Sequence, residues 1–224
     1  PVFSKHGVVS SLAWGMDGKV TYVLEGNINY TGAVITWLCK DLKLIQSPKE
    51  TEELARQASV EDSAYLVPAF TGLGAPYWES NAKALLCGMS RTTGKAEVVR
   101  AALECIAYQI TDIIKAMEDD SGISIQELRV DGGPTKNQYL MKFQSDIAEK
   151  PVLIPKEEEL SGTGAAYAAG IGLGVYEKQK LFSRIERQTF LPEMSKELVE
   201  KQYQGWKEAI YMVLGRKNEE IKAS

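Results

Sequence analysis

The feature that most constrains the fold is a long stretch of helical periodicity over residues 96–119. Its apolar residues advance by three or four positions at a time, which is the spacing of one face of an α-helix. The members of this stripe are Val98, Val99, Ala102, Leu103, Ile106, Ile110, Ile113, Ile114 and Met117. Ser121-Gly122 follows, and glycine commonly ends helices there. We therefore expect a long helix that buries one face.

Shorter elements surround this helix. Two β-prone runs, over 8–14 and 19–24, flank Asp17-Gly18, which is a strong hairpin signal. Pro68 indicates that another strand is an edge strand or ends there. Strands are expected over 65–70, 125–130 and 152–154, an apolar run covers 84–89, and helices are expected over 32–45, 51–58, 136–149, 161–175 and 198–214. The order predicts an α/β fold, with a mixed sheet and helices on both faces.

Composition excludes several classes of protein. The 224 residues carry 26 Lys and Arg against 30 Asp and Glu, so no basic surface for nucleic acid is expected. No apolar run is long enough for a membrane span, and no signal peptide is recognised. Cys39, Cys87 and Cys105 are an odd number without a CxxC pair, which argues against disulfides and structural zinc and favours a cytoplasmic location. Because the chain begins with Pro1, we expect it to start inside a longer protein.

The sharpest local feature is the junction of strand, Gly132-Gly133 and helix. A glycine pair there lets backbone approach a flat or phosphorylated ligand, and the next helix offers free N–H groups and its positive dipole end. Asn137, on the first turn of that helix, could hydrogen-bond a nucleotide. The alternative is a plain tight turn, with Asn137 on the surface.

Three further glycine-containing segments have two interpretations each. The loop of residues 161–164 resembles a phosphate-binding loop, but helix capping and close helix packing explain it better. The segment of residues 72–78, with Tyr77 and Trp78, could line a cleft or anchor an interface, or it could fasten a loop to the core. Gly32 could admit a ligand or simply begin a helix.

No catalytic or metal-binding group emerges from the residues. Asp131, Glu104 and Asp112 have no partner at a known catalytic spacing, and His6 is a poor candidate for a base. We therefore assign no catalytic residue and no metal ligand. The residues themselves indicate an α/β domain with a nucleotide-facing loop.

Four motifs in register resemble one family. They are residues 68–78 (PAFTGLGAPYW), residues 100–109 (RAALECIAYQ), the VDGG of residues 130–133 with Asn137 and residues 140–147, and residues 164–170 (GAAYAAG). Together they resemble the C-terminal domain of the FGGY family of carbohydrate kinases, with the glycerol kinases as the most similar branch. The likeness extends from about residue 7 to residue 206.

The resemblance implies a ribonuclease H-like, actin-like ATPase fold, with ATP and Mg²⁺ bound between two such domains. The γ-phosphoryl group then passes to a primary hydroxyl. The positions that correspond to the family's nucleotide-binding residues are Gly32, Thr36, Gly132, Gly133 and Asn137. Thr36 stands where these kinases usually have Gln, so its hydroxyl reaches a ligand less directly.

The resemblance also implies a domain plan. Residues 1–215 form the nucleotide-side domain with an insertion at about 32–83, and residues 216–224 form a charged tail. An N-terminal domain, absent from the chain, would supply the catalytic Asp and the polyol contacts. The expected reaction is glycerol and ATP to glycerol 3-phosphate and ADP, in a homo-oligomer, with this fragment alone inactive. Xylulose or another polyol or ketose as substrate, a non-catalytic actin-like module and a purely structural domain stay open.

Overall fold

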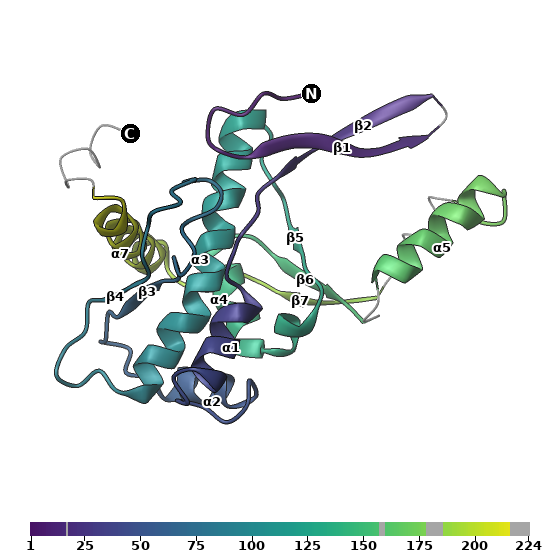
Figure 1. Ribbon diagram of the computed structural model, residues 1–224. Coiled ribbons are helices and arrows are strands. Elements are labelled where there is room, and N and C mark those ends of the chain that lie inside the picture. The colour runs from purple at the N-terminus through teal and green to yellow at the C-terminus, as the bar shows by residue number, and fades with distance from the viewer. Residues whose placement is uncertain (17, 157–159, 178–185, 216–224) are drawn as a thin grey trace.

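The computed structural model describes residues 1–16, 18–156, 160–177 and 186–215. Helix α3 (Lys95–Ser121) runs the length of the body, and the other elements lie around it (Figure 1). The long predicted helix is thus confirmed, and Gly122 ends it in the left-handed conformation. In chain order, the other elements are β1 (Val9–Met16), β2 (Lys19–Glu25), α1 (Gly32–Lys40), α2 (Glu50–Gln57), β3 (Tyr65–Val67), β4 (Leu85–Cys87), β5 (Leu128–Arg129), the 3₁₀ turn η1 (Gly133–Lys136), α4 (Gln138–Ala148), β6 (Val152–Pro155), α5 (Leu160–Gly172), β7 (Arg187–Phe190) and α7 (Lys196–Leu214).

Among the described residues, the strands pair as three small sheets. Strands β1 and β2 form the predicted antiparallel hairpin, and β3 pairs antiparallel with β4. The mixed sheet has the order β5-β6-β7, parallel between β5 and β6 and antiparallel between β6 and β7. Strand β7 was not predicted, because its four residues, Arg187–Phe190, show no apolar run.

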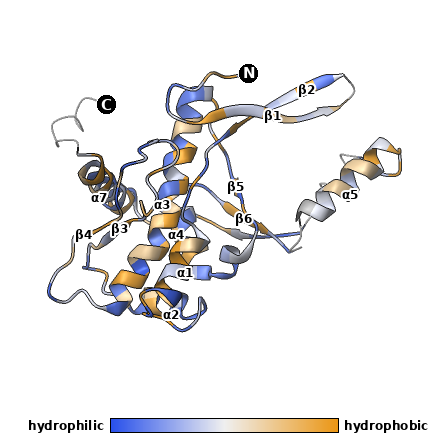
Figure 2. Cartoon of the chain, viewed as in Figure 1, coloured by the Kyte–Doolittle hydropathy of each residue, from blue (hydrophilic) through white to orange (hydrophobic). Residues whose placement is uncertain are grey.

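The core forms where helices and strands meet on α3. Hydrophobic and hydrophilic residues alternate along this helix (Figure 2), but burial is not confined to one face as expected, because residues 99–108 are all buried. The side chains buried with it come from α1, β3, α4, β6 and α7, and include Val34, Leu38, Leu66, Val67, Leu140, Phe143, Val152, Trp206 and Ile210. The ring of Tyr108 stacks on that of Trp206, with centroids 5.3 Å apart, which ties α3 to α7.

A buried carboxylate fastens three parts of the chain together. Asp112 of α3 is 4% exposed and accepts hydrogen bonds from Tyr77 (2.7 Å), Tyr203 (2.6 Å) and Trp206 (2.8 Å). Tyr77 belongs to the glycine-rich loop of residues 72–78. Tyr77 therefore fastens this loop to the core, and its side chain does not line a cleft.

Several predicted boundaries need correction. The helix predicted over 32–45 ends at Lys40, and Lys43 has a left-handed φ of 54°. Ile45 lies in the loop after the helix, but its side chain is only 2% exposed. Its burial explains why the apolar spacing continues beyond the end of the helix. The strand predicted over 65–70 ends at Val67, directly before Pro68, and the strand predicted over 125–130 pairs only at 128–129.

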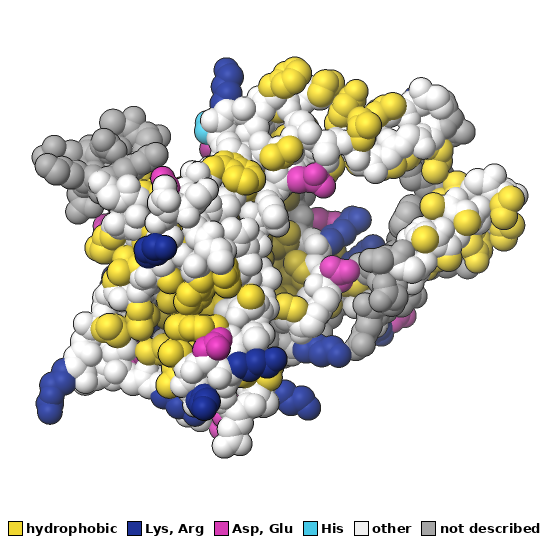
Figure 3. All heavy atoms as spheres, viewed as in Figure 1, with side chains coloured by type: hydrophobic (Ala, Val, Ile, Leu, Met, Phe, Trp, Pro, Cys, Tyr) yellow, Lys and Arg dark blue, Asp and Glu magenta, His cyan; other side chains and the backbone are white. Residues whose placement is uncertain are grey.

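Two arms project from the body. The β1–β2 hairpin and α5 lie at the outer edge of the molecule, with hydrophobic side chains on their surfaces (Figures 1 and 3). We expected the small residues of α5 to pack against another element, but Ala165, Ala166 and Ala169 are exposed. Gly170 instead makes room for the ring of Tyr176, which follows the helix. In the described part of the chain, no helix has the length and apolar character that crossing a membrane requires.

Candidate functional site

One pocket brings together four of the five predicted binding residues. Gly32 and Thr36 of α1, Gly133 of η1 and Asn137 between η1 and α4 all line it. Its volume is about 580 Å³, which is within the range of pockets for small molecules and cofactors. Gly32 and Gly133, which are 101 positions apart in the sequence, therefore meet at one site.

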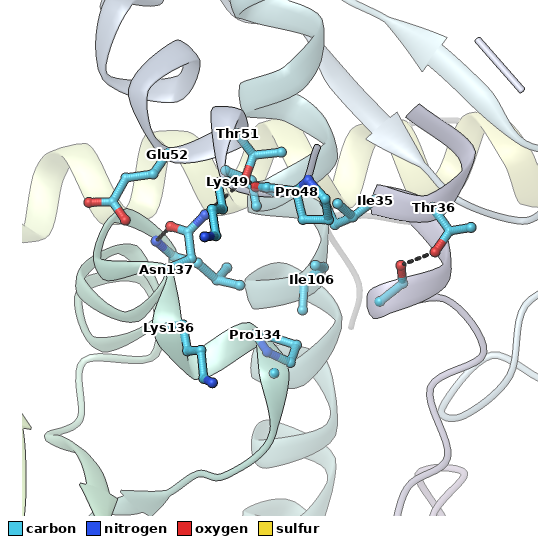
Figure 4. A pocket seen from close by; sticks show the side chains of 14 residues that line it. Ile35, Thr36, Pro48, Lys49, Thr51, Glu52, Ile106, Pro134, Lys136 and Asn137 are labelled. Carbon is cyan, nitrogen blue, oxygen red and sulfur yellow. Dashed lines mark hydrogen bonds between the residues drawn. The ribbon is translucent and has the colours of Figure 1, made fainter. Parts of the chain in front are cut away.

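The walls of this pocket are mostly apolar. Ile35 of α1, Leu103 and Ile106 of α3, Leu140 of α4, Pro48 and Pro134 contribute hydrophobic surface. In the close-up, Pro48 and Lys49 lie on one side of Ile106, and Pro134 and Lys136 on the other (Figure 4). An apolar slot with a few polar groups at its edge suits a flat heteroaromatic ring.

The backbone of Gly32 and Gly133 has free space beside it where it lines this pocket. A Cβ atom added at either glycine would meet no other atom within 4 Å, and neither residue has a positive φ. Packing and conformation therefore do not require glycine at these two positions. A ligand that approaches the backbone closely would require it.

Gly132 has a different reason to be glycine. Its φ of 89° with a ψ of 178° is a conformation open essentially to glycine alone. It does not line the pocket of Gly32 and Asn137. It lines a neighbouring hollow of about 560 Å³, together with Gly133, Asp131, Lys156 and Gln188. Gly132 thus shapes the turn that sets Gly133 at the pocket.

Asn137 is a helix N-cap as well as a pocket residue. We expected it on the first turn of a helix that begins at 136, but the 3₁₀ turn ends at Lys136 and Asn137 is extended. Its Oδ1 accepts a 2.9 Å hydrogen bond from the amide of Leu140, and its Nδ2 donates a 3.0 Å bond to Oγ1 of Thr51. The alternative that Asn137 is a plain surface residue is wrong, since it is half-buried and links α4 to α2.

Two of the N–H groups that α4 was expected to offer to a ligand already have partners. The amide of Gln138 donates a 2.9 Å hydrogen bond to the carboxylate of Glu52, and the amide of Leu140 is bonded to Asn137. Glu52 also pairs with Arg56 at 2.9 Å. A carboxylate already occupies this helix end and would repel a phosphate there.

Thr36 lies exposed at the edge of the pocket. Its hydroxyl donates a 3.2 Å hydrogen bond back to the carbonyl of Gly32, within α1 (Figure 4). The oxygen keeps lone pairs that can accept a hydrogen bond from a ligand. The side chain can therefore act as an acceptor at the pocket rim without leaving its helix.

The sequence did not reveal the contribution of α2. Pro48, Lys49, Thr51 and Glu52 line the pocket beside η1, although the sequence showed only a charged helical segment there. These residues become part of the site only through the packing of α2 against α3 and α4. The burial of Thr51, which is 1% exposed within an otherwise charged segment, is visible only in the structure, so no sequence signal pointed to these residues.

No acid or base of α3 faces this pocket. Glu104, on another side of the helix, accepts a 2.5 Å hydrogen bond from Tyr139 and lies 3.8 Å from Arg100. Burial raises the pKa of Glu104 to about 7, because desolvation outweighs the hydrogen bond and the Arg100 charge. Within the described ranges, no group of three or more His, Cys, Asp or Glu residues is arranged to hold a metal ion.

Comparison with known proteins gives one consistent result. Residues 1–173 match the family described as "FGGY family of carbohydrate kinases, C-terminal domain". The chain is 47% identical over 209 residues to a glycerol kinase of Carboxydothermus hydrogenoformans, and 45% identical over 212 residues to one of Geobacillus sp. (strain WCH70). These alignments cover 92% and 93% of this chain but 42% of each relative, so the chain spans about two fifths of their length.

Solved structures agree with the sequence relatives. The glycerol kinase of Plasmodium falciparum, solved with ADP, is 33% identical with a TM-score of 0.87, and covers 95% of this chain and 43% of that chain. A ligand-bound xylulose kinase from Lactobacillus acidophilus, at 21% identity and a TM-score of 0.77, shares the fold over 92% of this chain and 42% of that one. The predicted α/β fold of the ribonuclease H-like, actin-like ATPase class is confirmed.

Proposed function

Because the chain belongs to the FGGY family of carbohydrate kinases, we propose that it is the adenosine-binding part of an ATP-dependent kinase. The observation that carries the proposal is the pocket that Gly32, Thr36, Gly133 and Asn137 line together. Its apolar walls would hold the adenine ring, and the two unobstructed glycines would let the nucleotide lie against the backbone. The P. falciparum glycerol kinase that resembles this chain was solved with ADP, which supports the choice of nucleotide.

We propose glycerol as the phosphoryl acceptor of the whole protein, with glycerol 3-phosphate and ADP as products. The glycerol kinases at 45–47% identity support this choice. A xylulose kinase at 21% identity shares only the fold, so xylulose or another polyol or ketose is the second candidate. We expect the catalytic Asp and the polyol contacts in an N-terminal domain, beyond the 224 residues.

The contribution of this chain to phosphoryl transfer would be positional. In-line transfer depends mainly on holding donor and acceptor in line and on stabilising charge. Binding the adenosine end fixes where the γ-phosphoryl group can reach. Magnesium would arrive as part of MgATP, and we assign it no ligand in this chain.

The remaining expectations belong to the whole protein as well. We propose that it acts in the cytoplasm, as a homo-oligomer, and without nucleic acid as a partner. The excess of acidic over basic residues supports the last point. The domain boundaries at 1–215 and 32–83 remain predictions, and residues 216–224 lie outside the described residues.

Calorimetric titration of the 224-residue chain with ADP tests the nucleotide site. We expect binding, and we expect Gly32→Ala and Gly133→Ala to weaken it about tenfold, because each new Cβ would separate the ligand from the backbone. Gly172→Ala is the matched control: its Cβ also meets no atom within 4 Å, but Gly172 lies on α5, away from the pocket. Equal affinities for wild type and both pocket variants would contradict the site, and absence of ADP binding would contradict the function.

A further inference from the structure

We propose that Thr51 is a positioning residue, which fixes the side-chain amide of Asn137 so that Asn137 offers an N–H group to a ligand. This inference deepens the proposed function and rests on it. It starts from the 3.0 Å hydrogen bond between Nδ2 of Asn137 and Oγ1 of Thr51. The two residues are 86 positions apart in the sequence.

The direction of this hydrogen bond is set by Thr51. The single hydroxyl hydrogen of Thr51 is donated to the carbonyl of Pro48 at 2.6 Å. Oγ1 can therefore only accept from Asn137, and the group that faces it must be the NH₂ of the amide. Thr51 is 1% exposed, so water does not replace either partner.

The other end of the amide gives the same orientation. The backbone N–H of Leu140 needs an acceptor, and Oδ1 of Asn137 lies 2.9 Å from it. A flipped amide would place two donors together at Leu140 and two acceptors together at Thr51. Both ends thus exclude the flipped amide.

The fixed orientation determines what a ligand meets. An amide nitrogen carries two hydrogens, and Thr51 takes one of them. Asn137 lines the pocket, so the second hydrogen of Nδ2 is a donor for an acceptor atom of the nucleotide, such as a ring nitrogen or a ribose oxygen. Without Thr51, the amide nitrogen would lose the partner that holds it in place.

The chain permits this role to be separated from simple packing. Glu52 independently joins α2 to α4 through the amide of Gln138 at 2.9 Å. Replacing Thr51 with Val keeps its size and removes only the hydroxyl, while the Glu52 contact remains. Thr51→Ser keeps the hydroxyl and removes a methyl group.

The test is ADP titration of the 224-residue chain and its variants. We expect Thr51→Val to weaken binding about tenfold, the value of one hydrogen bond, and Thr51→Ser to bind within about twofold of wild type. In an Asn137→Asp background, which has no NH₂ to orient, Thr51→Val should change affinity no further. A residue that serves only packing would lower the melting temperature without this dependence on residue 137.

Each outcome has a separate meaning. Wild-type affinity in Thr51→Val, measured well below its melting temperature, would overturn the role of Thr51 alone. The same would follow from equal losses with Thr51→Val in the wild-type and Asn137→Asp backgrounds. Absence of ADP binding by the wild-type chain would overturn the proposed function, and this inference with it.

Discussion

The indole nitrogen of Trp206 donates a 2.8 Å hydrogen bond to Oδ2 of Asp112, which joins the last helix of the described chain to its longest one. The same carboxylate accepts hydrogen bonds from Tyr77 and Tyr203, and Lys207 lies 3.7 Å away. One buried charge therefore has three neutral donors and a nearby cation. This arrangement makes Asp112 a centre of stability rather than of catalysis.

Asp112→Ala should destabilise the chain by about 3–5 kcal/mol, because the buried Trp206 and the half-buried Tyr77 and Tyr203 lose their common acceptor. Urea denaturation followed by tryptophan fluorescence measures the change. Asp119→Ala, an exposed carboxylate on the same helix, is the matched control and should cost less than about 0.5 kcal/mol. Similar losses for the two variants would contradict the role of Asp112.

Gly205, inside α7, should resist replacement by alanine, although alanine is about 1 kcal/mol better in a helix. A Cβ at this position would lie 2.4 Å from the hydroxyl of Tyr65, which donates to the carbonyl of Gln202. We expect a net loss of about 1–2 kcal/mol in thermal or urea unfolding. In a Tyr65→Ala background, the same Gly205→Ala change should become stabilising, and a loss of the same size there would refute the steric explanation.

The pKa of Glu104 predicts how stability depends on pH. Desolvation raises the pKa from 4.5 to about 7 in the folded chain, so the folded state favours the protonated acid. This contribution to stability is present below pH 4.5 and is lost as the pH rises through about 7, by as much as about 3 kcal/mol.

Glu104→Gln is the test of this pH dependence, since glutamine stays neutral and still offers an oxygen to Tyr139. The free energy of unfolding of wild type minus that of Glu104→Gln, from urea curves between pH 5 and pH 8, should fall as the pH rises. A difference that stays constant over this range would show that Glu104 ionises normally.

The two neighbouring glycines of the turn should respond differently to alanine. Gly132→Ala is expected to cost about 1–3 kcal/mol, because its φ of 89° with ψ of 178° is strained for any side chain. Gly133→Ala should leave the unfolding free energy within about 0.5 kcal/mol of wild type, since its Cβ meets nothing. The urea denaturation midpoints of the two variants measure these changes. Equal losses of stability would contradict the expected difference between Gly132 and Gly133.

Local patterns predicted the elements that local chemistry determines. The stripe of α3, the β1–β2 hairpin and the end of β3 at Pro68 each depend on neighbouring residues. Strand β7 depends on its partner β6 instead, and its own residues carry no pattern. Ile45 shows the opposite case, where a helical spacing continues into a loop because the side chain is buried.

The residues of the candidate site also fall into those that the sequence predicted and those that it missed. Gly133 and Asn137 were predicted from a short motif that carries the resemblance to a family, and Gly32 from its correspondence to a family position. Thr51 and Glu52 were missed, because their place at the pocket follows from the packing of α2 on α4 and not from their neighbours in sequence. Only tertiary structure shows that the Asn137 amide already has two partners.

Every residue that lines the pocket of Gly32 and Asn137 comes from one continuous stretch, between Gly32 and Leu140. The described residues of the hairpin before this stretch and of α5 after it contribute no side chain to the pocket. Substitutions in these arms therefore leave the lining of the pocket unchanged. The pocket is thus a unit built within residues 32–140, although the motif of residues 164–170 that supports the family resemblance lies outside it, on α5.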